Sequence, residues 1–173
     1  MNRYISKYIA RFILIVSIQI LVLNNIFFFG YINPYAYILF IIMLPISISK
    51  NQLLILSFFL GLVIDMFQNS MGSHAFASVL IAFLRNYILG ALTPQIRNKN
   101  QGSIEYSIKE FGIQSVLIYT TLMTIIHHLV LFSLEIFEFK PIYILLKTIP
   151  SSICSIILII SFQYLFIKNK NNE

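Results

Sequence analysis

GLVIDMFQNSMGSHAF, residues 61–76, places a carboxylate inside a sequence that otherwise has the character of lipid-embedded helix. Asp65 follows one apolar run, and after a short polar turn a second apolar run begins at His74. An ionisable side chain in the hydrocarbon layer costs about 3 kcal/mol on insertion scales unless it faces a bundle interior or reaches the interface. The position of Asp65 therefore indicates how the two helices around it pack.

The composition predicts an integral membrane protein. The 173 residues are 58% hydrophobic and only 10% charged, with a mean hydropathy of +0.85, which soluble domains of this size do not reach. Each crossing of the hydrocarbon layer takes about 20 residues of helix. We therefore expect an all-α bundle that uses residues 1–173 as a single integral membrane domain.

Apolar runs separated by polar or turn residues predict six transmembrane helices. The expected spans are 12–29, 31–49, 52–68, 74–93, 112–133 and 141–167. Pro45 and Pro150 lie inside the second and sixth spans, where the missing backbone donor predicts a bent or broken helix. The N-terminus resembles a signal peptide but has no small-residue cleavage site, so it is interpreted as a retained first helix.

Membrane topology explains the formal charge of +6 better than nucleic-acid binding does, because the basic residues lie at the ends of apolar runs and do not line one polar face. If the N-terminus is cytoplasmic, all but three of the twelve Lys and Arg residues lie on the cytoplasmic side, in agreement with the positive-inside rule. Lys140 lies outside, and Arg85 and Lys147 lie within spans. With six spans, both termini are expected to be cytoplasmic.

Small and polar side chains recur at helical spacing on four spans and predict the packing seams of the bundle. The four sets are Ser57, Gly61 and Asp65; His74, Ser78, Ala82, Asn86 and Gly90; Gly112, Thr120, Thr124 and His128; and Lys147, Ser151 and Ser155. The helix directions place Asp65, the histidines and Lys147 in the outer half of the bundle and Arg85 in the inner half. Lys147 is the expected counter-ion of Asp65, with a histidine as the alternative. In an alternative interpretation, the small and polar residues only allow close helix packing, and the Asp65 carboxylate reaches the outer lipid headgroups.

No motif for catalysis, cofactor binding or metal binding stands out in the sequence: it has no GxSxG, HExxH, Walker loop or glycine-rich dinucleotide turn. The adjacent His127 and His128 diverge by about 100° around a helix and cannot easily bind one ion. Only Asp65 with these histidines offers two titratable partners for acid–base catalysis. We therefore expect a protein without enzymatic activity, cofactor or metal.

The central motif resembles the signature of the rod shape-determining protein MreD family. GLVID at 61–65 is followed, after six residues, by GSHA at 72–75. The layout around the motif is also similar, with Asn24-Asn25 after the first span, NPY at 33–35, Leu44-Pro45 in the second span and FLR at 83–85. Met71 and Ser73, which flank Gly72, depart from the family pattern and leave the geometry of this turn open.

The resemblance implies a bundle of six transmembrane helices, similar in fold to the substrate-binding subunits of energy-coupling-factor transporters. It also implies a non-enzymatic scaffold of the cell-elongation complex in the bacterial inner membrane, which organises peptidoglycan synthesis and cell shape. The implied partners are the transmembrane anchor of MreC and, indirectly, MreB, RodA and a class B penicillin-binding transpeptidase. The candidate residues for structure or partner contact are Gly61, Asp65, Gly72, His74, Arg85 and Lys147.

Two other functions are compatible with the same residues. A small-ligand-binding membrane subunit of a vitamin or metal transporter would need a polar outer pocket, for which Asp65, His74, His127 and Tyr143 are available. An intramembrane enzyme acting on lipid-linked sugars would lose activity on Asp65→Asn while remaining assembled. The copurifying partner distinguishes the scaffold from the transporter subunit, because the latter docks on a soluble ATPase module.

Overall fold

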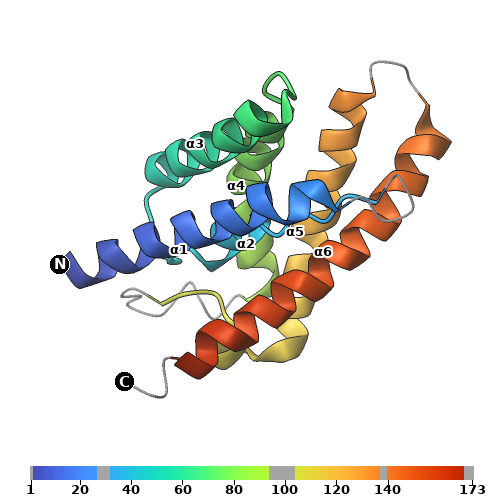
Figure 1. Ribbon diagram of the computed structural model, residues 1–173. Helices are drawn as coiled ribbons and strands as arrows, with labels where there is room; N and C mark the ends of the chain where they lie inside the picture. The colour runs from blue at the N-terminus through green and yellow to red at the C-terminus, as the bar shows by residue number, and fades with distance from the viewer. Residues whose placement is uncertain (1, 27–31, 94–103, 137–139, 170–173) are drawn as a thin grey trace.

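The computed structural model describes residues 2–26, 32–93, 104–136 and 140–169, and the regular secondary structure in these ranges is helical (Figure 1). The elements are α1 (Asn2–Leu21), the 3-10 helix η1 (Leu23–Asn25), α2 (Ile38–Met43), α3 (Lys50–Gln68), α4 (Ser73–Leu92), α5 (Ile108–Glu135) and α6 (Pro141–Asn169). Five of the described helices are long and apolar enough to cross a membrane. This is the architecture of a multi-pass membrane protein.

The second predicted span is not a membrane-length helix. Of this span the structure describes residues 32–49, and their only helix is the six-residue α2, which ends at Met43. The residue before a proline is pushed out of the α region, and Leu44, which precedes Pro45, has φ −59° and ψ 150°. Pro45 therefore breaks the helix, as the sequence predicted, but the expected long helix around it is absent from this described segment.

Residues 32–46, here called the buried crossing, nevertheless extend from one end of the bundle to the other. The segment begins beside the C-terminal end of α1, where Gln19 bonds the Pro34 carbonyl. It ends where the Ile46 N–H donates to the Ile104 carbonyl at 2.9 Å. No residue from 35 to 44 is more than 3% exposed, and α2 lies among the long helices (Figure 1). Non-helical backbone at membrane depth is tolerated only when protein surrounds it in this way.

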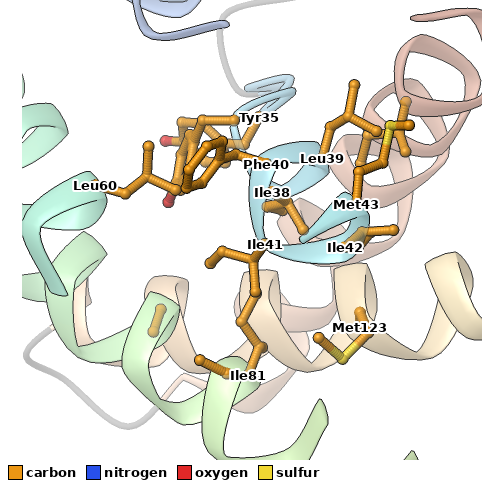
Figure 2. Packing of buried hydrophobic residues seen from close by; sticks show 14 of the residues in the cluster. Tyr35, Ile38, Leu39, Phe40, Ile41, Ile42, Met43, Leu60, Ile81 and Met123 are labelled. Carbon is orange, nitrogen blue, oxygen red and sulfur yellow. The ribbon is translucent and has the colours of Figure 1, made fainter. Parts of the chain in front are cut away.

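The long helices pack as a series of neighbours around the buried crossing. α3 packs against α4, α4 against α5, and α5 against α6, while α1 contacts α2 and α3. Figure 2 shows the apolar side chains of α2 pointing outward in several directions, toward Leu60 of α3, Ile81 of α4 and Met123 of α5. The apolar core of the bundle is therefore centred on the short helix.

The predicted seams are buried over most of their length, but they drift at their ends. Gly112 is exposed where its own φ +78° and ψ 159° interrupt the helical backbone of α5. On α4, Asn86 and Gly90 are exposed, whereas Arg85 and Leu89 take the buried positions. A series of i, i+4 residues rotates by about 40° per step around a helix of 3.6 residues per turn. Three or four such steps are enough to move a residue off the packed face.

Glu105 joins the start of α1 to the loop before α5. Its carboxylate contacts Lys7 Nζ at 2.6 Å, the Tyr8 hydroxyl at 3.0 Å and Arg11 Nη2 at 3.2 Å. Burial alone would raise the pKa of Glu105, but the charges of Arg11 and Lys7 outweigh burial and hold this pKa below its usual 4.5. This end of the bundle, opposite to Asp65, is called the Glu105 end below.

Acid is expected to weaken the Glu105 end. A carboxyl group whose pKa is lowered on folding stabilises the fold above its unfolded pKa, and this stabilisation disappears as the pH falls through the folded pKa. We expect the melting temperature in detergent to fall between about pH 6 and about pH 3, with Glu105→Gln removing part of this slope, a few degrees at most. Glu110→Gln, at an exposed neighbouring carboxyl, is the control. Equal slopes for the two variants would contradict the prediction.

Candidate functional site

Asp65 joins the end of α3 to the start of α4. Its side chain is 5% exposed, and Oδ1 accepts hydrogen bonds from the His74 N–H at 2.9 Å and the Ser70 hydroxyl at 2.5 Å. Oδ2 accepts from the Ala75 N–H at 2.8 Å. The first N–H groups of a helix have no intrahelical acceptor, and a negative charge there is favourable. Asp65 is therefore satisfied by the N-terminus of α4, and we call this arrangement the Asp65 lock.

Gly61 and Gly72 shape the same junction. A Cβ atom on Gly61 would lie 2.6 Å from the backbone of Ala75 and of His74, too close for any side chain. Gly72 has φ +90°, a conformation that residues with a Cβ rarely adopt. Glycine thus brings the backbones of α3 and α4 into contact and closes the turn between them.

The predicted ion pair between Asp65 and Lys147 is wrong. Lys147 Nζ lies 3.0 Å from Glu135 Oε2 and 4.2 Å from the centre of the Phe132 ring. The predicted alternative, a histidine, contacts Asp65, but through the backbone N–H of His74. A search for opposite charges misses this partner because the positive end of a helix carries no charged side chain.

A chain of hydrogen bonds starts at His74 and enters the core. The Tyr37 hydroxyl lies 2.8 Å from His74 Nδ1 and 2.7 Å from His127 Nε2, and all three residues are 0% exposed. His74 Nε2 lies 3.1 Å from Gln68 Oε1, which accepts, so His74 carries its hydrogen on Nε2. Tyr37 then donates to His74 Nδ1 and accepts from His127 Nε2–H. This chain of Gln68, His74, Tyr37 and His127 is called the histidine–tyrosine relay.

Side chains from α1 and α6 hold the non-helical backbone of the buried crossing. Gln19 Oε1 accepts from the Ala36 and Tyr37 N–H groups at 2.8 and 3.3 Å, and its Nε2 donates to the Pro34 carbonyl at 3.1 Å. Ser151 accepts from the Asn33 N–H at 3.1 Å, and Ser155 accepts from the Tyr35 N–H at 2.8 Å. These side chains supply partners that a regular helix would supply itself.

Arg85 serves the other end of the buried crossing. It is 0% exposed, and its guanidinium donates to the carbonyls of Leu44 and Pro45, directly after α2. A cation at a helix C-terminus satisfies carbonyls that lack intrahelical partners. Arg85 therefore holds the buried crossing and does not join the site near Asp65.

Gln19→Leu is expected to destabilise the protein by about 1–3 kcal/mol, because the backbone groups of the buried crossing that it bonds would lose their partner. Gln163→Leu is the matched control: Gln163 is also 0% exposed, but its amide has no hydrogen-bond partner among the described residues. Its replacement is expected to be neutral or stabilising, since an unpaired buried amide is removed. Thermal unfolding in detergent, followed by circular dichroism, measures both. Similar losses for the two variants would argue against this role of Gln19.

Four of the predicted residues, Gly61, Asp65, Gly72 and His74, thus meet at one junction. Lys147 approaches it only indirectly, since its partner Glu135 lies 3.9 Å from His74 Nε2. Tyr143, which was considered for an outer pocket, is 52% exposed. Sequence reasoning missed Gln19, Tyr37 and Glu135. The available signals were Gln19 inside the apolar stretch 12–23 and the sequence NPYAY at 33–37, which ends at Tyr37.

The described residues contain no group of three or more His, Cys, Asp or Glu side chains placed to hold a metal ion. The two adjacent histidines have different surroundings: His127 Nε2 bonds Tyr37, whereas His128 bonds the Thr124 carbonyl and the Ser155 hydroxyl. Their ring nitrogens thus connect α5 to the buried crossing through His127 and to α6 through His128.

No protein-family model, no curated protein and no solved structure matches this chain.

Proposed function

We propose that this chain is a membrane scaffold of the MreD type, which holds a partner in the cell-elongation complex of the bacterial inner membrane. The observation that carries the proposal is the Asp65 lock. The residues of the MreD-like motif, separated in sequence, build one structural device that fixes α3 against α4. A motif whose residues all serve packing suits a protein that presents a fixed surface to another chain.

The surroundings of Asp65 support a non-enzymatic role. Both carboxylate oxygens are occupied by three donors within 2.9 Å. A general acid or base must instead exchange a proton with a substrate within hydrogen-bond reach. Asp65 is the carboxylate that an intramembrane enzyme of lipid-linked sugars would need, so its occupied oxygens favour the scaffold.

We count the buried crossing as a sixth pass beside the five long helices, in keeping with the proposed similarity to six-helix transporter subunits. Figure 1 shows the start of α1 and the end of α6 on one side, and the ring of Phe166 near the end of α6 lies 5.1 Å from the Arg11 guanidinium of α1. With the positive-inside rule, we place this side in the cytoplasm. The proposed partner is the transmembrane anchor of MreC, and through it MreB, RodA and the class B transpeptidase.

Affinity capture of the tagged full-length protein from its own bacterium, in mild detergent, tests the scaffold. We expect to recover a protein with one transmembrane helix and a periplasmic coiled coil, and depletion of the scaffold should make rod-shaped cells round. Recovery of a soluble ATPase module without such a partner would overturn the proposal.

A small-ligand-binding subunit is the second candidate, because a broken crossing lined by polar groups is typical of transporter binding sites. A pocket of about 350 Å³ also opens between α1 and α3, with Asn24, Asn25 and Gln68 among its lining residues. Native mass spectrometry of the purified protein decides this point. A nutrient retained in stoichiometric amount would favour the transporter subunit.

A further inference from the structure

The histidine–tyrosine relay contains three titratable groups, His74, Tyr37 and His127, that the scaffold role does not use. It joins four parts of the molecule, because Gln68 ends α3, Tyr37 belongs to the buried crossing, His74 lies in the first turn of α4 and His127 lies in α5. Tyr37 is also held at its backbone by Gln19, so its side chain and main chain both fix the crossing. A change in the relay therefore acts directly on residues 32–46.

The hydrogens of the neutral relay can be ordered in one consistent way. His127 Nε2–H donates to Tyr37, Tyr37 donates to His74 Nδ1, and His74 Nε2–H donates to Gln68 Oε1. His127 Nδ1 has no hydrogen-bond partner among the residues described. A neutral His127 with its hydrogen on Nε2 leaves Nδ1 without a hydrogen, so Nδ1 then needs no acceptor.

An additional proton breaks the order of donors and acceptors in the neutral relay. Protonated His74 carries a hydrogen on Nδ1, which then faces the Tyr37 hydroxyl as a donor. Tyr37 must then turn its own hydrogen away from His74, either toward Ser78 or toward His127 Nε2. In the second case His127 has to carry its hydrogen on Nδ1. That N–H has no acceptor in the described parts of the chain, and a buried donor without a partner is unfavourable.

Charged and titratable groups surround the relay on each element packed against it. They are Asp65 on α3, His128 and Glu135 on α5, Lys147 on α6 and Tyr35 in the buried crossing. Glu135 Oε1, at 3.9 Å from His74 Nε2, offers a counter-ion to a protonated His74. Taking that role would draw Glu135 away from Lys147. Protonation of His74 would thus be favoured by Glu135 and would weaken the ion pair between Glu135 and Lys147.

We propose that the histidine–tyrosine relay is a proton-sensitive latch, in which neutral histidines hold the buried crossing at Tyr37 and protonation of His74 beside Glu135 releases it. The latch predicts that acid loosens residues 32–46 while the long helices remain folded. Acidification on the side of Asp65 would then change the core around which the bundle is packed.

Hydrogen–deuterium exchange on the full-length protein in lipid nanodiscs tests the latch. The exchange rates, corrected for the intrinsic effect of pH, are compared at about pH 7.5 and about pH 4, because a buried imidazole is protonated only at a lower pH than an exposed one. We expect amide exchange in residues 35–44 to rise on the order of tenfold at the lower pH, with exchange in α3 unchanged. No pH-dependent change in residues 35–44 would overturn the proposal.

Two variants separate the latch from a general effect of acid. The double variant His74→Asn and His127→Gln keeps an acceptor and a donor facing Tyr37 but cannot be protonated, so it should lose the pH response. His128→Gln, outside the relay, should keep it. If the double variant does not assemble, Tyr37→Phe replaces it, with high exchange expected at both pH values. A pH response that persists in the double variant or in Tyr37→Phe, or that disappears in His128→Gln, would refute the latch.

Discussion

Gly61→Ala is expected to destabilise the protein by about 1–3 kcal/mol. The added methyl group would lie 2.6 Å from the Ala75 nitrogen and the His74 carbonyl oxygen. These are backbone atoms inside the first turn of α4, so they cannot move aside without displacing the helix. Because Asp65 bonds the same two residues, the shift would also strain the Asp65 lock. One added methyl group therefore disturbs the whole junction of α3 and α4.

Gly90→Ala is the matched control for this experiment. Gly90 also lies in a long helix, but a Cβ atom there would meet nothing within 4 Å. Alanine favours a helix over glycine by about 0.5–1 kcal/mol, so this variant should be as stable as the wild type or slightly more stable. Melting temperatures in one detergent measure both variants. A stable Gly61→Ala protein would show that the two backbones are not in contact.

Hydropathy located four of the five long helices to within a few residues, because their exposed and packed faces are both mostly apolar. The expected first span, 12–29, was misplaced: α1 is Asn2–Leu21, and residues 27–29 of that span lie outside the described residues. The expected span 74–93 corresponds to α4 (Ser73–Leu92), and 141–167 corresponds to α6 (Pro141–Asn169). Hydropathy failed at 31–49, since apolar residues buried in protein are indistinguishable in sequence from apolar residues facing lipid. Only the prolines at 34 and 45 indicated that the helix between them is short.

The sequence predicted which residues meet at the candidate site, but it did not predict the hydrogen bonds between them. The spacing of Gly61, Asp65 and His74 identified the junction of α3 and α4, because each residue occupies a buried helix face. The partner of Asp65 could not be predicted from charges, since it consists of two backbone N–H groups and a serine hydroxyl. Likewise, Tyr37 meets His127 across 90 residues of sequence, a contact that depends on the path of the buried crossing.

Asp65→Asn is expected to destabilise the protein by about 1.5–3 kcal/mol, the range for hydrogen bonds to a charged group. An amide has the shape of the carboxylate, but its NH₂ group must face one of the N–H donors of His74 or Ala75. The variant would also lose the negative charge at the N-terminus of α4. Ser70→Ala, which removes one of the three donors, should cost less, about 1 kcal/mol.

The lock also predicts how Asp65 combines with Lys147. If the carboxylate is satisfied by the helix N-terminus, Asp65→Asn and Lys147→Met should be additive within about 0.5 kcal/mol, because the two side chains share no bond. Glu135→Gln and Lys147→Met should instead couple, since their charged atoms lie 3.0 Å apart. A double-mutant cycle on melting curves measures both pairs. Strong coupling between Asp65 and Lys147 would restore the ion pair that their charges suggest and would leave the N-terminus of α4 without the role assigned to it.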